Sequence, residues 1–297
     1  MRRTRRGSGM LELLVALPLV ALLGLVAVQL LITVQRTTVR DDASRFASRE
    51  LRQATAILLA ELRMVGASDV LAWTTTSIEF QGPVGAGIVC GTRDSTLYVV
   101  GDESAAARVP TDNAPDSTGA TWLQPVQSAD RVTAWLQGRS MLDTLRPHVS
   151  SVATAAGGAH CHGSPLLPLG AAPTTSLTLA GGLPGNVAIG TPVTVQRRYQ
   201  FALYSASDGG WYLGRRTFGP AGWDVIQPVA GPLASASERG LVVTVRDRRG
   251  GILTAASDSA SRVDVAVRAP RPPLLGTTRS AIVDSLTVSV ALRGARP

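Results

Sequence analysis

The stretch MLELLVALPLVALLGLVAVQLLITV, residues 10–34, decides the fold of this chain. It is apolar except for Glu12, Gln29 and Thr33, and residues 13–28 contain no polar side chain. An α-helix rises about 1.5 Å per residue, and about 20 apolar residues cross the hydrocarbon core of a bilayer. The stretch therefore predicts a membrane-spanning helix near the N-terminus.

The charges that flank this stretch predict its orientation. Arg2, Arg3, Arg5 and Arg6 precede the apolar run, whereas residues 36–42 carry charges of both signs. Because positively charged flanks remain on the cytoplasmic side, we expect a single-pass inner-membrane protein with a cytoplasmic N-terminus. Everything after the helix is then expected in the periplasm.

A cleaved secretory signal and a plain uncleaved anchor are the alternatives. The apolar run is longer than the about 7 to 15 residues of a signal peptide, and it contains no A-x-A cleavage site. A plain anchor leaves Glu12 unexplained, because a carboxylate just inside the hydrocarbon edge costs about 1 to 3 kcal/mol. Such a residue indicates a functional partner.

Residues 5–15, RRGSGMLELLV, resemble the class III leader of type IV pilins and of type II secretion pseudopilins. In that family a short basic leader ends in glycine, and a dedicated membrane peptidase cuts after it and N-methylates the new terminus. The resemblance implies that residues 1–7 are a leader and that the cut falls between Gly7 and Ser8. Glu12 is then the fifth residue of the mature chain, where the family has a glutamate.

Two residues depart from the family pattern. Ser8 stands where the first mature residue is usually large and apolar, and Gly9 replaces the commoner threonine. The peptidase tolerates such changes, so the resemblance still implies cleavage before Ser8 and methylation of its amine. The cut also removes four arginines, which leaves 25 basic against 21 acidic residues and a net charge of +4.

The resemblance implies an assembly role for Glu12. Cleavage exposes an α-amine, and a buried carboxylate on a neighbouring subunit can pair with it. Neither charge then stays unpaired in an apolar filament core. The expected partners are the prepilin peptidase, the inner membrane and other pilin or pseudopilin subunits bound through the N-terminal helix.

The helical pattern continues as an amphipathic half over residues 35–66, beyond the membrane half at residues 8–34. Apolar side chains recur at steps of three or four, which is the spacing of one helical stripe. The stripe consists of Val39, Ala43, Ala47, Leu51, Ala54, Leu58, Leu62 and Val65. We expect the C-terminal end of the stripe to pack on a sheet of the same chain and the membrane half to stay free for other subunits.

Three residues predict interruptions of this helix. Gly66 is expected to end it as a C′ residue, and Pro18 and Gly24 predict a kink or local unwinding in the membrane half. Residues 59–66, LAELRMVG, are similar to the ELR-x-A-G ending of the first helix in W-type minor pilins and J-type minor pseudopilins.

Residues 67–297 predict a β-rich exported domain. Hairpins are expected from residues 193–203 with 211–217 and from residues 241–246 with 252–255, and alternating valines mark a strand over 262–268 and another over 286–292. Short strands are predicted at 77–81, 96–100 and 131–136. A Gly/Ala/Ser/Pro-rich insertion at about 150–192 carries one predicted strand, 176–180.

The predicted fold class is α+β, with the long N-terminal helix packed on an antiparallel sheet as in pilins. The order of strands in the last third also resembles the same minor-pilin subfamily: an R-x-Y-x-F strand, a Trp-Tyr-Leu-x-Arg-Arg return, a V-x-V-x-V strand and a final V-x-L-R.

Cys90 and Cys161 are expected to form a disulfide, because an exported domain folds in an oxidising compartment. A metal site is the alternative, since His160, Cys161 and His162 lie together and His148 is near in the sequence. A zinc signature needs paired ligands at two separated places, so no metal is expected. Asp112, Asn113 and Asp116 lack the spacing of a calcium loop and indicate a solvated loop.

The composition argues against enzyme chemistry. All 29 basic residues are arginine, which excludes a lysine Schiff base, a lysine general base and a P-loop lysine. The chain has three histidines, no G-x-S-x-G motif and no paired carboxylates that stand out. We therefore expect no enzyme and no cofactor.

The formal net charge of +8 raises the question of a nucleic-acid partner. Four groups of residues could form a DNA-binding face: Arg197 and Arg198, Arg215 and Arg216, residues 246–249, and Trp211 with Tyr212. Charged strand faces and turns are the preferred interpretation, so nucleic acid is not an expected partner.

The sequence thus predicts a minor pilin or pseudopilin, a structural subunit of a type IV pilus or of a type II secretion pseudopilus. The large domain suits a position at the tip or in assembly priming. A single-pass membrane protein with an extracytoplasmic binding or sensory domain is the alternative.

Overall fold

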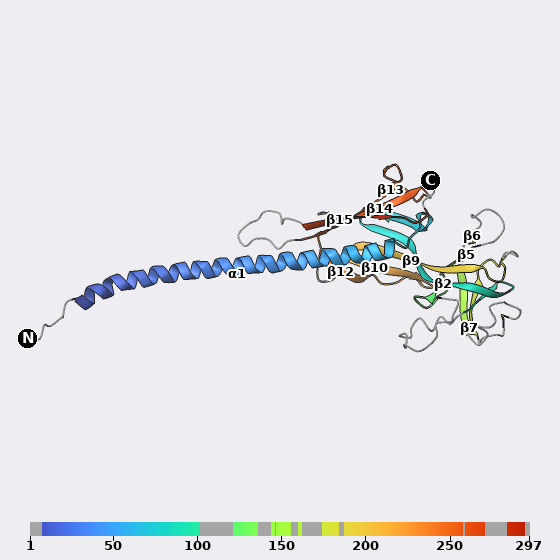
Figure 1. Ribbon diagram of the computed structural model, residues 1–297, viewed down its shortest axis with the longest axis horizontal. Coiled ribbons are helices and arrows are strands. Elements are labelled where there is room, and N and C mark those ends of the chain that lie inside the picture. Colours follow the sequence, from blue (N-terminus) through green and yellow to red (C-terminus); the bar gives the residue numbers. More distant parts are fainter. Residues whose placement is uncertain are drawn as a thin grey trace, which may run out of the picture.

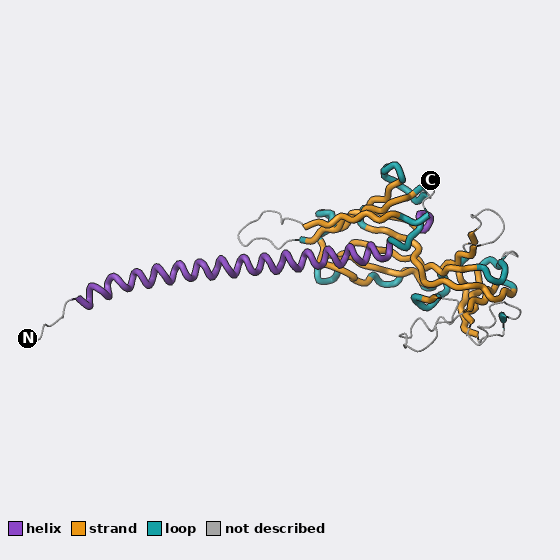
Figure 2. The backbone as a smooth tube through the Cα atoms, viewed as in Figure 1, coloured by secondary structure: helices purple, strands orange, loops and turns teal. Residues whose placement is uncertain are grey.

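The computed structural model describes residues 8–100, 121–135, 144–145, 147–155, 160–161, 174–183, 187–257, 259–270 and 284–294. In this part of the chain, a long N-terminal helix leads into a domain built from two antiparallel sheets (Figure 1). The α+β class predicted from the sequence is confirmed. The helix projects far beyond the domain, so its N-terminal end lies far from the sheets (Figure 2).

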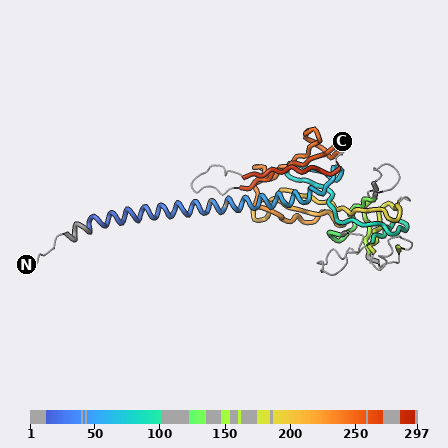
Figure 3. The backbone as a smooth tube through the Cα atoms, in the orientation of Figure 1, coloured from blue at the N-terminus to red at the C-terminus, as the bar shows by residue number. Residues whose placement is uncertain are grey.

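Helix α1 spans Ser8–Leu62 without a break. Its 55 residues correspond to a length of about 80 Å. The predicted unwinding at Pro18 and Gly24 is wrong, and Figure 3 shows a gentle curve in place of a sharp kink. An internal proline removes one backbone hydrogen bond, and the leucine-rich turns around Pro18 favour the helix strongly enough to continue through it.

The helix ends differently from the prediction at Gly66. Gly66 has φ −84° and ψ 162°, which is extended and not the left-handed conformation of a C′ glycine. The far end of the chain takes over the capping role: Arg293 N donates to Val65 O at 3.1 Å, and Ala67 N donates to Arg293 O at 3.0 Å. A short 3₁₀ helix, η1 (Ala67–Asp69), then leads into the first strand.

The larger sheet has twelve strands among the described residues. They are β1 (Val70–Thr74), β2 (Ser77–Arg93), β3 (Thr96–Val100), β4 (Thr121–Trp122), β5 (Arg131–Trp135), β6 (Thr144–Leu145), β7 (Val149–Ala155), β8 (Thr174–Leu179), β9 (Pro192–Ser205), β10 (Trp211–Gly219), β11 (Gly222–Trp223) and β12 (Gln227–Leu233). The main path runs β11-β10-β9-β2-β3-β8-β7.

The long antiparallel pair β2 and β9 forms the centre of this sheet. The predicted strand at residues 77–81 is only the start of β2, which continues to Arg93. The predicted hairpin of β9 and β10 is confirmed, with Trp211 opposite Ser205 and Thr217 opposite Tyr199. Gly209, at φ +79°, closes its turn in a conformation that favours glycine.

The smaller sheet has the order β13-β14-β15, with β13 at Leu241–Asp247, β14 at Ala260–Ala269 and β15 at Asp284–Ala291. The predicted pairing of residues 241–246 with 252–255 is wrong, because β14 is the partner of β13. Ile252 makes only an isolated bridge to Arg246 and is 64% exposed. Burial decides the register, since Val263, Val265 and Val267 of β14 enter the core completely.

The segment at 150–192 contributes two strands to the larger sheet. β8 corresponds to the predicted strand at 176–180, whereas β7 was not predicted from the sequence. β7 pairs with β8, and β8 pairs with β3. The small and polar side chains of β7 hide its strand character, because their alternation carries little hydrophobic signal.

The C-terminal part of α1 lies between the two sheets (Figure 1). The main core cluster joins α1 residues such as Leu58 to Phe80 and Phe201 of the larger sheet and to Val263 and Val265 of the smaller one. A second cluster, which includes Val84, Leu97 and Val195, fills the end of the larger sheet that lies farther from the helix. The domain thus holds one half of α1 and leaves the other half outside.

Candidate functional site

The membrane half of α1 is an apolar surface with no protein cover in the described chain. Every side chain described from Leu13 to Val39 is exposed, including Leu14 at 72% and Leu23 at 67%. The described residues include one helix that is long and apolar enough to cross a membrane. Exposed apolar area of this size is unfavourable in water and requires lipid or other helices around it.

The apolar stripe of the amphipathic half is buried from Ala47 onward. Leu51, Leu58 and Leu62 are at most 4% exposed, and Ala54 is fully buried. The predicted stripe is confirmed for these residues, whereas its first member, Val39, is 67% exposed. Burial of each leucine stabilises the packed state by about 1.5 to 3 kcal/mol, so the helix is held firmly where it enters the domain.

Polar contacts fix the helix against strand β12. Glu50 Oε2 accepts a hydrogen bond from Gly231 N at 3.1 Å, and Gln53 Nε2 donates to Val229 O at 3.3 Å. The sequence pattern did not reveal these contacts, because polar residues on the outer side of a stripe normally face solvent. The only local indication of these contacts is that a glutamate and a glutamine lie three residues apart, close to the start of the buried stripe.

A third polar contact ties the end of α1 to the larger sheet. Glu61 Oε1 lies 3.7 Å from Arg215 Nη2, and the guanidinium of Arg215 stacks over the ring of Tyr199 at 4.5 Å. Tyr199 OH donates to Gln124 Oε1 at 3.1 Å. Burial raises the pKa of Tyr199, although Arg197 and Arg215 act against it, so the hydroxyl keeps its proton near neutral pH.

The processing and assembly residues expected from the sequence lie at the free end of α1. Gly7 is outside the described residues. Ser8 is the first residue of the helix, and Glu12 follows one turn later in the same helix.

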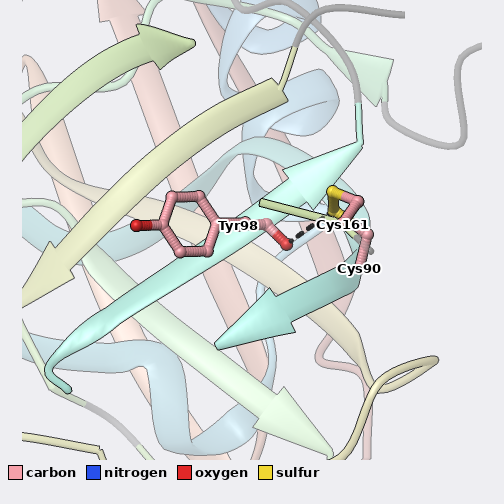
Figure 4. The surroundings of a disulfide bond; sticks show 3 residues. All are labelled: Cys90, Tyr98 and Cys161. Atoms are coloured by element: carbon pink, nitrogen blue, oxygen red, sulfur yellow. Dashed lines mark hydrogen bonds between the residues drawn. A yellow bond between two sulfur atoms is a disulfide. The ribbon is translucent and has the colours of Figure 1, made fainter. Parts of the chain in front are cut away.

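Cys90 and Cys161 form a disulfide, with their Cα atoms 5.0 Å apart (Figure 4). Both residues are buried, and Cys90 Sγ lies 3.3 Å from the carbonyl oxygen of Tyr98. The ring of His160 stacks on the ring of Tyr98 at a centroid distance of 4.3 Å. The bond connects β2 to a segment 71 residues further along the chain.

The residues of the alternative metal site either make other contacts or lie outside the part of the chain that the structure describes. His148 Nδ1 lies 3.3 Å from Ala129 O, and His162 is outside the described residues, as are Asp112, Asn113 and Asp116. Among the described residues, no group of three or more His, Cys, Asp or Glu side chains could hold a metal ion.

Most arginines of the candidate DNA-binding face have specific partners within the domain. Arg197 is 5% exposed and forms a double hydrogen bond with Asp130, at 2.8 Å for Nε to Oδ1 and 2.8 Å for Nη2 to Oδ2. Burial alone lowers the pKa of Arg197, but the hydrogen bond and charge of Asp130 contribute in the other direction and the net pKa is raised. Arg197 therefore stays charged.

The neighbouring arginines form an arginine–aromatic cluster, which consists of Arg198, Arg216, Phe218 and Trp223. Arg198 pairs with Glu79 and lies over both rings, 5.1 Å from Phe218 and 5.0 Å from Trp223. Arg216 lies 4.7 Å from the ring of Trp223. Each such contact stabilises by about 0.5 to 2 kcal/mol, which gives these arginines a structural role.

Comparisons with protein-family models, with curated protein sequences and with solved structures find no match to the chain.

Proposed function

We propose that the chain is a minor pilin or pseudopilin, a structural subunit of a type IV pilus or of a type II secretion pseudopilus. The observation that carries the proposal is the division of α1. Its membrane half is exposed from Leu13 to Val34, and the apolar stripe of its other half is packed between two sheets. The position of Glu12, five residues after Gly7, supports the same reading because it matches the leader pattern of that family.

The division of α1 suits a subunit that passes from a membrane into a filament. Lipid tails cover the exposed leucines and valines before assembly, and the helices of neighbouring subunits cover them afterwards. Both surroundings are apolar, so the transfer between them exposes little apolar area to water. The packed segment from Ala47 to Leu62 fixes the helix to the domain, so the domain moves together with the helix.

Glu12 supplies the specificity of assembly in this proposal. A lone carboxylate is unfavourable in an apolar bundle, whereas a carboxylate paired with the α-amine of a neighbouring Ser8 is neutralised. The domain is exported to the periplasm and the chain remains in the inner membrane until it is assembled. The second core beyond the helix enlarges the domain, which favours a position at the tip or in priming over a repeated position in the shaft.

The processing step provides the direct test. The full chain is co-expressed with a prepilin peptidase, and the N-terminus of the membrane fraction is sequenced. We expect a mature chain that starts at Ser8, with loss of cleavage in a Gly7→Val variant and retention in the matched Gly9→Ala variant. A chain that keeps its first seven residues, or that starts elsewhere, contradicts the proposal.

The alternative is a membrane-anchored binding or sensory domain. A cleft on the larger sheet, lined by Glu79, Gln81, Arg131 and Arg198 among others, favours it. Glu12→Ala separates the two functions. A filament subunit with this change still inserts into the membrane but no longer co-purifies with partner subunits, because the carboxylate is missing. A plain anchor retains its partners, since a more apolar helix inserts at least as well.

A further inference from the structure

A polar cleft of about 650 Å³ lies on the face of the larger sheet that points away from α1. Ile78 and Phe80 of β2 belong to the core beneath the helix. Successive strand residues point to opposite faces, so Glu79 and Gln81 point the other way, and both line the cleft. The cleft therefore faces outward while the helix occupies the inner face.

The polar lining comes from strands that are distant in sequence. Glu79 and Gln81 belong to β2, Arg131 to β5 and Arg198 to β9, and His148 lies just before β7. The ring of Phe218 provides an apolar wall, extended by small aliphatic side chains of β1 and of the turn before β5. The volume falls in the range of about 300 to 1,000 Å³ that is typical of small-molecule sites.

One of these polar groups lacks a partner within the described chain. Gln81 is 4% exposed, and its Oε1 accepts no hydrogen bond there. A buried amide oxygen without a partner is unfavourable, and native proteins contain few of them. A hydroxyl donor from a bound molecule would satisfy this group after a small rotation of the amide.

Arg198 is held in position before any ligand arrives. Glu79 pairs with its guanidinium on one side, and Phe218 and Trp223 stack against it. A side chain fixed in this way loses little conformational entropy on binding. Two arginines and one carboxylate line the cleft, so its lining carries an excess of positive charge.

We propose that this cleft binds an acidic saccharide, a sugar unit that carries a carboxylate. The planar groups of Glu79, Gln81 and the arginines form pairs of hydrogen bonds with adjacent sugar hydroxyls, and Phe218 packs against the apolar face of the ring. The excess positive charge of the lining, from Arg131 and Arg198 against Glu79, favours the sugar carboxylate.

The test measures binding of galacturonic acid trimers to the full chain in a detergent without a sugar headgroup. Isothermal titration gives the affinity, and the fluorescence of Trp223 and the other tryptophans gives an independent reading. Maltotriose, a neutral trimer of the same length, tests the need for the carboxylate. The variants are Arg131→Gln and Phe218→Leu, and Arg249→Gln removes an exposed arginine outside the cleft as a matched control.

We expect saturable binding of the acidic trimer that weakens about tenfold in each cleft variant and stays unchanged in the control. Circular dichroism and the unfolding midpoint show that each variant is folded. Absence of saturable binding, equal binding of maltotriose, or equal weakening in Arg249→Gln overturns the proposal. Because the readout uses no filament partner and no peptidase, its failure is distinct from a failure of the assembly function.

Discussion

Arg197 and Asp130 form a buried, doubly hydrogen-bonded ion pair at the junction of the two apolar cores. Arg197 follows Val195 of the outer cluster and precedes Tyr199 of the helix-bearing cluster on the same face of β9. Its Nη2 also donates to Pro125 O at 2.7 Å. The pair thus joins the loop before β5 to the central strand where the two clusters meet.

Loss of one member of this pair is expected to destabilise the domain strongly. Arg197→Met leaves the Asp130 carboxylate buried without its partner, which costs about 3 to 5 kcal/mol. Urea unfolding of the full chain, followed by tryptophan fluorescence, measures the change. The double variant Arg197→Met with Asp130→Leu should recover part of the loss, and a single variant within about 1 kcal/mol of the parent contradicts this view.

The two halves of α1 are expected to respond differently to the same substitution. Leu58→Ala creates a cavity between the sheets and should lower the free energy of unfolding by about 2 to 5 kcal/mol. Leu23→Ala, at a position that is 67% exposed, should leave domain stability nearly unchanged. Urea unfolding in the same detergent compares the two, and similar losses would show that the membrane half also packs on the domain.

The disulfide between Cys90 and Cys161 is expected to stabilise the exported domain. Closing a loop of 71 residues stabilises by about 4 kcal/mol in the chain-entropy model. Thiol titration of the unreduced chain in denaturant should find no free thiol, and Cys90→Ser with Cys161→Ser should lower the unfolding midpoint. Two titratable thiols before reduction would refute the bond.

Asp264 is expected to make the smaller sheet sensitive to acid. Burial alone raises the pKa of this carboxyl, but hydrogen bonds from Ser289 and Arg246 and the charge of Arg262 outweigh it, so the net pKa is lowered. A depressed pKa stabilises the fold above the ordinary value near about pH 4, and this stabilisation is lost as the pH falls through the folded value.

The variant Asp264→Asn tests this dependence. It should be less stable than the parent at neutral pH, and the difference should shrink as the pH is lowered below about 4. Unfolding midpoints between neutral and acidic pH measure the difference. Asp247→Asn, on the same sheet and without a resolved ion pair among the described residues, is the control, and a constant difference across the pH range argues against the role of Asp264.

Local sequence patterns predicted the elements whose signal is periodic. The apolar run, the stripe from Ala47 to Leu62 and the hairpin of β9 and β10 follow from spacing alone, because periodicity directly reports which face is buried. Strand β3, at Thr96–Val100, also has the predicted bounds. The small and polar strand β7 was missed for the same reason, since it has almost no hydrophobic alternation.

Long-range contacts decided what local patterns could not. Gly66 looked like the end of the helix, but the backbone of Arg293, more than two hundred residues later, caps the turn before it. The stretch at 252–255 looked like the partner of β13, but the valines of β14 bury more apolar area against the same strand. A contact with a residue far away in the sequence does not alter the local sequence pattern, so the pattern cannot predict it.

The sequence by itself determined a long helix with one apolar half and one amphipathic half, followed by a β-rich domain, because hydrophobic spacing and turn residues act over a few positions. Only the tertiary structure decided that the amphipathic half lies between two sheets, that Arg197 and Asp130 meet between the cores, and that Glu79, Gln81 and Arg198 share an outward cleft. The pairing of β2 with β9, for example, brings Glu79 and Arg198 together although they are 119 residues apart in the chain. No local sequence pattern reveals such a pairing.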